Sequence, residues 1–159
     1  MKLDSDNFSL KEWATNKIGV VYPTPEREEM VEGLEMYKQA VADKYNKDIE
    51  DVAVLITDGD RLGNSGSMHN KGKASDIFTI LTDEDRSLSS AEQMKIIEDL
   101  DIFTGRGLYP FNKGFIHVDI RDGLYPDKEP LRWYRDKQGE YHYKNNDYTK
   151  SNYNGYLGG

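Results

Sequence analysis

The segment FIHVDIR, residues 115–121, alternates strictly between two kinds of side chain. Successive side chains of a β-strand point to opposite faces, so this alternation predicts a strand with one buried face. Three aliphatic side chains are expected to face the core: Ile116, Val118 and Ile120. The opposite face would carry Phe115, His117, Asp119 and Arg121. This strand therefore brings an imidazole, a carboxylate and a guanidinium to one surface.

A second strand is predicted at Ala74–Ile80, and it places another histidine near the first. His69 lies in the turn before this strand, and Asp76 follows seven positions later. If the two strands are neighbours, His69, Asp76 and His117 converge. Two imidazoles and one carboxylate suit Zn²⁺ and leave a fourth position open for water, as in catalytic zinc sites. Gly72 would let the turn bend back towards the strand.

The remaining patterns predict helices and strands around this pair. Thr24-Pro25 begins a helix that ends near Asn46, with an apolar stripe of Met30, Leu34, Tyr37 and Val41. Val52–Thr57 is predicted to be a buried strand, and Ser89 with Glu92 forms a capping box before a second helix. Residues 103–114, FTGRGLYPFNKG, are interpreted as a loop. We expect an α+β fold with a small, mostly antiparallel sheet flanked by helices.

The chain of 159 residues is long enough for one domain with its own core. Residues 1–135 are assigned to this domain, and residues 136–159 to a polar, tyrosine-rich tail that should be poorly ordered unless it docks. His142, within that tail, is interpreted as an exposed residue without a function.

Composition excludes several classes of function. There is no cysteine, so a metal must be held by His, Asp or Glu. The net charge of −8 comes without a basic patch, so we expect no nucleic-acid partner. No apolar run is long enough to span a bilayer, and no signal peptide is recognisable at the N-terminus. We therefore expect a protein that is cytoplasmic at synthesis. We also expect a monomer.

Five motifs together resemble the LAS superfamily of zinc peptidases, in which D-alanyl-D-alanine carboxypeptidases, L-alanyl-D-glutamate endopeptidases and the hedgehog domain share a fold. The first is S-x-H-x-x-G-x-A-x-D at Ser67–Asp76. The others are NFSLKEW at 7–13, VLITDGDR at 54–61, GRGLYPFNKGFIHVDIRDG at 105–123 and Arg132-Trp133. These motifs are similar to the phage and bacterial branch that cleaves peptidoglycan.

The resemblance assigns roles to individual residues. It implies that His69, Asp76 and His117 bind zinc and that Arg61 stabilises the oxyanion of the reaction. A structural salt bridge to Asp58 or Asp60 is the alternative role for Arg61. Ser67 matches the motif serine, which orients substrate or a ligand, or caps the turn.

The general base is the one departure from the family pattern. Several branches place it two or three residues before the last histidine, where this chain has Phe115 and Gly114. Asp119 is the nearest carboxylate and is either the base or a group that orients a ligand. Asp99 and Asp101 are the next candidates for the base.

The function implied by the resemblance is a zinc-dependent carboxypeptidase or endopeptidase. Its substrate would be a stem or cross-link peptide of peptidoglycan, reached after release from the cell or as part of a phage particle, as an endolysin would be. Two rivals remain open: a zinc-binding module that has lost catalysis, and a structural component of a virion. The acidic charge mildly favours these rivals, because anionic wall polymers repel an acidic enzyme.

Overall fold

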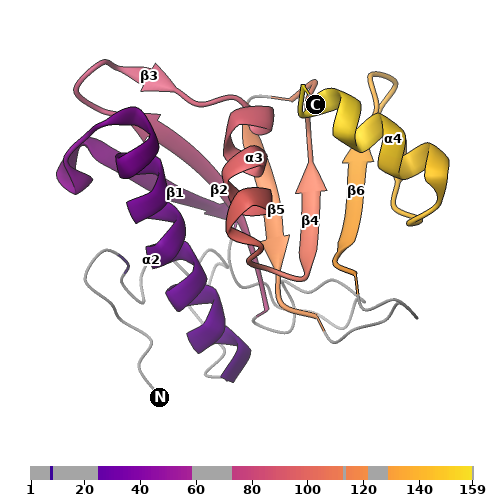
Figure 1. Cartoon of the computed structure of the whole chain (residues 1–159), viewed down its shortest axis with the longest axis horizontal. Coiled ribbons are helices and arrows are strands. Elements are labelled where there is room, and N and C mark those ends of the chain that lie inside the picture. The colour runs from indigo at the N-terminus through magenta and orange to yellow at the C-terminus, as the bar shows by residue number, and fades with distance from the viewer. Residues whose placement is uncertain (1–7, 9–24, 59–72, 113, 122–128, 159) are drawn as a thin grey trace.

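The computed structural model describes residue 8 and residues 25–58, 73–112, 114–121 and 129–158 (Figure 1). Three α-helices occur in these ranges: α2 (Pro25–Tyr45), α3 (Ser90–Leu100) and α4 (Asp147–Tyr156), with a short 3-10 helix η1 (Ile49–Asp51). The strands are β1 (Val52–Asp58), β2 (Ala74–Leu81), β3 (Arg86–Ser87), β4 (Gly105–Leu108), β5 (Phe115–Asp119), β6 (Leu131–Arg135) and β7 (Tyr141–His142).

These strands form one open sheet in the described part of the chain. Six of them lie in the order β1-β2-β5-β4-β6-β7, and β3 pairs with the end of β2. Every pair is antiparallel except β4 with β6, which is parallel. The predicted α+β class with a mostly antiparallel sheet is therefore confirmed. The predicted site requires the strands at 74–80 and 115–121 to be neighbours. They are neighbours, since β2 pairs directly with β5.

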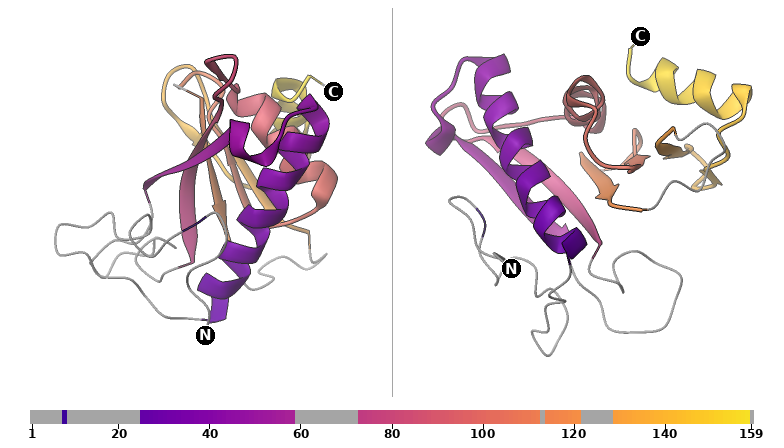
Figure 2. Two further views of the ribbon diagram at one scale, coloured as in Figure 1. Left: turned by 90° about the vertical axis from the view of Figure 1, so that its left-hand side faces the viewer. Right: turned by 60° about the horizontal axis from the view of Figure 1, so that its bottom comes forward.

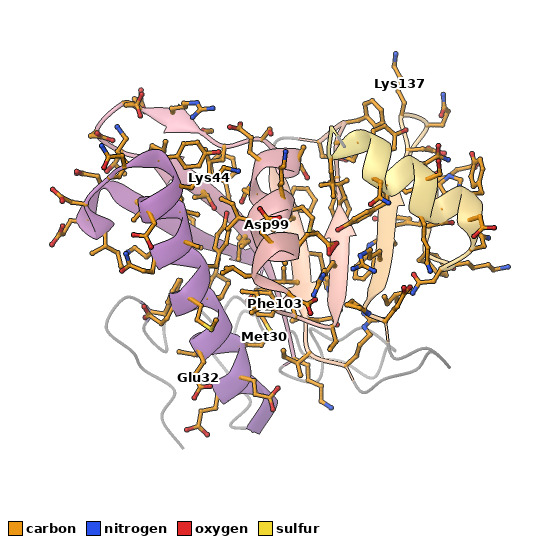
Figure 3. The ribbon with its side chains drawn as sticks, viewed as in Figure 1. Met30, Glu32, Lys44, Asp99, Phe103 and Lys137 are labelled. Atoms are coloured by element: carbon orange, nitrogen blue, oxygen red, sulfur yellow. The ribbon has the colours of Figure 1, made fainter. Side chains whose placement is uncertain are left out.

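The helices lie on one face of the sheet, as the side view in Figure 2 shows. The core fills the space between the helices and the sheet and includes Ile77, Ile116 and Val118, which are fully buried. Figure 3 shows Met30 and Phe103 next to each other beside α2, below the lower end of α3, whereas Lys137 projects away from the protein at the upper right. The alternation of β5 thus points its aliphatic residues towards the helices and His117 and Asp119 towards the other face.

The two helices with clear sequence patterns form as predicted. All four residues of the predicted stripe on α2 are fully buried: Met30, Leu34, Tyr37 and Val41. The capping box is present, because Ser89 Oγ accepts from the Glu92 N–H and the Glu92 carboxylate accepts from the Ser89 N–H, both at 3.0 Å. This reciprocal pairing satisfies backbone donors that the first turn of α3 would otherwise leave unpaired.

Two expectations about strands are wrong. The glycine-rich segment interpreted as a loop contains β4, an interior strand between β5 and β6. The strand at 52–57, expected to be buried, is β1, which lies at the end of the sheet that the described residues form, and Leu55 is 44% exposed. The described helices cover only one face of this mostly antiparallel sheet, so a strand can expose its other face, and a run of aliphatic residues does not by itself show that both faces are buried.

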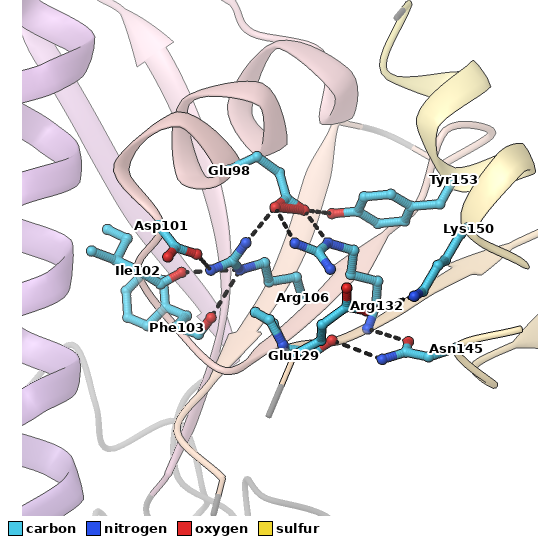
Figure 4. Close-up of polar contacts among 11 residues, drawn as sticks. Glu98, Asp101, Ile102, Phe103, Arg106, Glu129, Arg132, Asn145, Lys150 and Tyr153 are labelled. Carbon is cyan, nitrogen blue, oxygen red and sulfur yellow. Dashed lines mark hydrogen bonds and ion pairs between the residues drawn. The ribbon is translucent and has the colours of Figure 1, made fainter. Parts of the chain in front are cut away.

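The tyrosine-rich tail docks onto the domain. Residues 141–142 form β7 against β6, and α4 packs on β6 with Tyr153 fully buried. Glu98 of α3 joins these elements, because its carboxylate accepts from Tyr153 Oη at 3.0 Å and pairs with Arg106 and Arg132 (Figure 4). Arg106 is almost fully buried and also donates to the carbonyl oxygens of Ile102 and Phe103. The tail is thus held by buried charge and aromatic packing.

Candidate metal centre

Asp76 and His117 face each other on the sheet surface opposite the helices. They are directly paired residues of the antiparallel strands β2 and β5. Asp76 Oδ1 lies 3.0 Å from His117 Nδ1, and the two side chains are 16% and 10% exposed. Direct cross-strand partners have side chains on the same face, so the pairing register alone brings this carboxylate and this imidazole together.

The second ring nitrogen of His117 is held by Asp119. His117 Nε2 lies 2.8 Å from Asp119 Oδ2, and the Asp119 side chain is fully buried. Arg121 donates two hydrogen bonds to the same carboxylate: Nε lies 2.7 Å from Oδ1, and Nη2 binds Oδ2. A bidentate arginine–carboxylate pair has a defined geometry. The hydrogen bonds from Arg121 to Asp119 and between Asp119 and His117 therefore fix the plane of the imidazole.

This arrangement shifts the pKa of both buried groups. Burial by itself would lower the pKa of His117, but its hydrogen bonds with Asp119 and Asp76 outweigh burial and raise that pKa. Burial would raise the pKa of Asp119, but the hydrogen bonds from Arg121 and His117 outweigh it and lower that pKa. Asp119 is therefore an anion with both oxygens in use, which suits a group that orients its neighbour.

Two glycines of β4 make room for the site. A Cβ atom added to Gly105 would lie 1.9 Å from Asp119 Oδ1, and one added to Gly107 would lie 2.5 Å from Trp133 Cε2. Trp133 contacts the His117 ring at a centroid distance of 4.9 Å, and the Arg121 guanidinium lies 5.3 Å from the Trp133 ring centroid. The absence of side chains on this face of β4 lets Asp119 and Trp133 lie flat beside His117.

The donor atoms fit zinc. Zinc bonds to nitrogen and oxygen are about 2.0–2.2 Å long, so two ligand atoms on one tetrahedral ion lie roughly 3.4 Å apart. The 3.0 Å between Asp76 Oδ1 and His117 Nδ1 needs only a small adjustment to reach that separation. A histidine that binds a metal commonly donates its other N–H to a carboxylate, and Asp119 occupies that position. Metal binding would replace the proton at Nδ1, because ligands bind metals in their deprotonated form.

Several of the predicted site residues cannot be placed. His69, Arg61 and Ser67 lie outside the described residues. The structure thus brings together Asp76, His117 and Asp119 of the predicted set. Asp101, considered as an alternative base, binds Arg106 on the helix side of the sheet and is 79% exposed. Asp99 is exposed on α3, on that same side, so neither carboxylate lies beside the Asp76–His117 pair.

A second group of possible metal ligands lies in the β6–β7 hairpin. Asp136, Glu140 and His142 each offer a ligand atom within 4.8 Å of the others. Among the described residues, this group could hold a metal ion. Asp136 Oδ2 lies 2.8 Å from His142 Nε2, and Asp136 Oδ1 accepts from the N–H groups of Gln138 and Glu140. These bonds close the turn of the hairpin without any metal. His142 is half-buried and stacks on Tyr134, so it is not the exposed tail residue that the sequence suggested.

Sequence reasoning missed the supporting residues of the site. The alternation of residues 115–121 predicts the face of Arg121 but not its partner, and the sequence motifs assign no role to Trp133, Gly105 or Gly107. The signal was present in the alternation of Gly105 and Gly107, because two glycines two residues apart leave one face of a strand bare. A bare face in the middle of a sheet indicates that large side chains from neighbouring strands cross it.

Comparisons with known proteins found no matching family model, no similar curated protein and no similar solved structure. None of the helices in the described ranges combines the length and the apolar character needed to cross a membrane.

Proposed function

We propose that this chain is a zinc-dependent peptidase that hydrolyses stem or cross-link peptides of peptidoglycan, as a carboxypeptidase or an endopeptidase. We further propose that its sheet and helices form the hedgehog and D-alanyl-D-alanine peptidase type of fold. The observation that carries the proposal is the pairing of Asp76 with His117 over a buried Asp119–Arg121 ion pair. A protein with this site would act on the wall after release or as part of a phage particle.

The proposed ligands are Asp76 and His117 together with His69, which the sequence motif supplies. Asp76 provides a carboxylate oxygen and His117 provides Nδ1, because its Nε2 faces Asp119. Zinc held there would supply Lewis acidity and lower the pKa of a coordinated water to about 7. Arg61 and Ser67 are proposed to hold the developing oxyanion and the substrate, as the family resemblance implies.

Asp119 is proposed to orient His117. Its full burial and its bonds to Arg121 and His117 leave no exposed carboxylate oxygen for a substrate proton. An anion behind the imidazole also makes Nδ1 a stronger donor to a metal. Arg121 in turn lowers the pKa of Asp119 and keeps it ionised, so that Asp119 can hold the imidazole in one orientation.

A zinc-binding module without catalysis is the second candidate. Two observations favour it: Asp119 has the contacts of an orienting group, and the positions where the family places a base are Gly114 and Phe115. Such a module would keep the metal and bind wall peptides, or would serve a structural role in a virion.

Incubation of purified muropeptides with the protein separates these candidates. The peptidase predicts new amines and shortened stems by mass spectrometry, with all activity lost in the presence of a chelator and regained with zinc. His117→Ala should be inactive and should lose zinc, and His142→Ala is the matched control that should retain zinc. Metal binding without product under any condition would refute the peptidase and leave the binding module.

A further inference from the structure

The C-terminal part of the chain has an exposed aromatic hollow that the proposed chemistry does not use. The hollow has a volume of about 240 Å³ and lies where β7 turns into α4. Three tyrosines line it: Tyr141, Tyr143 and Tyr148, which are 50%, 57% and 64% exposed. Clustered exposed rings of this kind mark a binding surface more often than isolated ones do. Half or more of each of these side chains is exposed, so burial in the core does not account for them.

The rest of the lining is polar. Lys144, Asn146 and Thr149 surround the tyrosine rings, and His142 lies beside Tyr148 at a centroid distance of 6.0 Å. None of the described residues that line the hollow carries a carboxylate. Tyrosine offers a flat apolar ring together with a hydroxyl, so the surface presents ring faces and hydrogen-bonding groups side by side. This combination suits a ligand that is rich in hydroxyl and amide groups and apolar along one face of a ring.

We infer that this hollow binds one N-acetylated sugar residue of the glycan strand to which the stem peptides are attached, an inference that rests on the proposed function. The axial C–H groups of a pyranose ring give it an apolar face for a tyrosine ring, and its hydroxyl and acetamido groups match the polar lining. The volume lies below the roughly 300–1,000 Å³ of pockets for drug-sized ligands, which fits a single sugar unit. A polypeptide segment or a nucleic-acid strand would need a longer groove or a basic surface.

The hollow is connected to the candidate metal centre across the same sheet. Tyr141 contacts Tyr109 edge to face at 6.2 Å, and Tyr109 contacts Phe115 at 4.4 Å, two residues before His117 on β5. Three strand spacings, β5 to β4 to β6 to β7, separate His117 from Tyr141. At about 4.8 Å each these amount to roughly 14 Å. An extended peptide of about four residues covers that distance, so a peptide attached to a sugar in the hollow reaches the Asp76–His117 pair.

The inference is tested by titrating the protein with tri-N-acetylchitotriose, a peptide-free oligosaccharide, and following the backbone amide signals by NMR. Shifts should concentrate on residues 141–149, with chelator present or absent. Tyr148→Ala should weaken binding at least tenfold, as truncation of an aromatic anchor does, whereas Tyr148→Phe, which keeps the ring, should bind within a few-fold of the unaltered protein. Phe111→Ala removes an aromatic side chain that is 49% exposed outside the hollow and should bind normally.

The outcomes separate this inference from the proposed function. Absence of shifts up to millimolar sugar, or an unchanged affinity in Tyr148→Ala, would overturn it even if the protein cleaves muropeptides. Equal loss in Tyr148→Ala and Phe111→Ala would show nonspecific adhesion and would also overturn it. A sugar-free stem peptide that depends on Tyr148 for binding would make the hollow a peptide subsite instead. Specific sugar binding by a protein that cleaves nothing would support the hollow and refute the peptidase.

Discussion

Substitution of Gly105 by alanine tests whether Asp119 lies where the structure places it. The new Cβ would be 1.9 Å from Asp119 Oδ1 and 2.2 Å from its Cγ, far inside van der Waals contact. Asp119 cannot move aside freely, because it is fully buried and held by Arg121 and His117. The methyl group must therefore either displace the carboxylate from both partners or push β4 away from β5.

The expected loss of stability is about 3 kcal/mol. Overpacking a filled interior costs about 1–3 kcal/mol, and breaking a buried ion pair costs about 3–5 kcal/mol, so the substitution should fall where these ranges meet. For a domain of this size that corresponds to a Tm lower by roughly 6–12 °C. Zinc affinity should fall by about ten- to a hundredfold as well, because the imidazole loses the carboxylate that orients it.

Gly155→Ala is the matched control. Gly155 lies within α4, and an added Cβ meets no atom within 4 Å. Alanine at an unstrained helical position should therefore raise stability by about 0.5–1 kcal/mol and leave zinc affinity unchanged. Both variants are measured by urea unfolding and by zinc titration. A Gly105→Ala protein with the Tm and the zinc affinity of the unaltered chain would show that this packing around Asp119 is incorrect.

Two further predictions concern the buried charges. If Asp119 orients His117, Asp119→Asn should weaken zinc binding by about ten- to a hundredfold, and added zinc should restore activity. A loss of activity of about a hundred- to ten-thousandfold that added zinc does not restore would instead identify Asp119 as the general base. Glu98→Gln should cost about 3 kcal/mol, because two arginines lose their anion. Burial by itself would raise the pKa of Glu98, but its arginine partners outweigh burial and lower that pKa. The stabilisation by Glu98 is therefore fully present above the ordinary glutamate pKa of about 4.3 and is lost as pH falls through the lower pKa of the folded state. Urea unfolding from pH 3 to 6 should accordingly show a weaker acid dependence in the variant, and an unchanged profile would contradict this role.

The parts of the fold that sequence predicted well are those with a single dominant period. The stripe of α2, the capping box of α3 and the alternation of β5 each depend on neighbours within a few residues. The pairing of Asp76 with His117 followed from one added assumption, that the two strands are adjacent. Local pattern and tertiary position agree in these elements, so each could be identified without knowledge of the rest.

The elements that sequence missed are those whose reasons lie elsewhere in the chain. Gly105 and Gly107 resemble loop residues, and only the bulk of Asp119 and Trp133 explains glycine in an interior strand. The composition of the tail is polar, yet Tyr153 is fully buried and donates its hydroxyl to Glu98, fifty-five residues away. The period-two spacing of the two glycines does not by itself distinguish a strand from a loop, because the side chains that require it lie on neighbouring strands. The docking of α4 likewise depends on a distant residue, so the sequence pattern leaves it open.

Zinc content after purification without chelator tests the central claim most directly. The protein should contain close to one zinc per chain. His117→Ala should lose the metal, because it removes Nδ1 from its place beside Asp76, and His142→Ala should retain it. Retention of zinc by His117→Ala together with its loss from His142→Ala would contradict the account and place the metal in the β6–β7 hairpin.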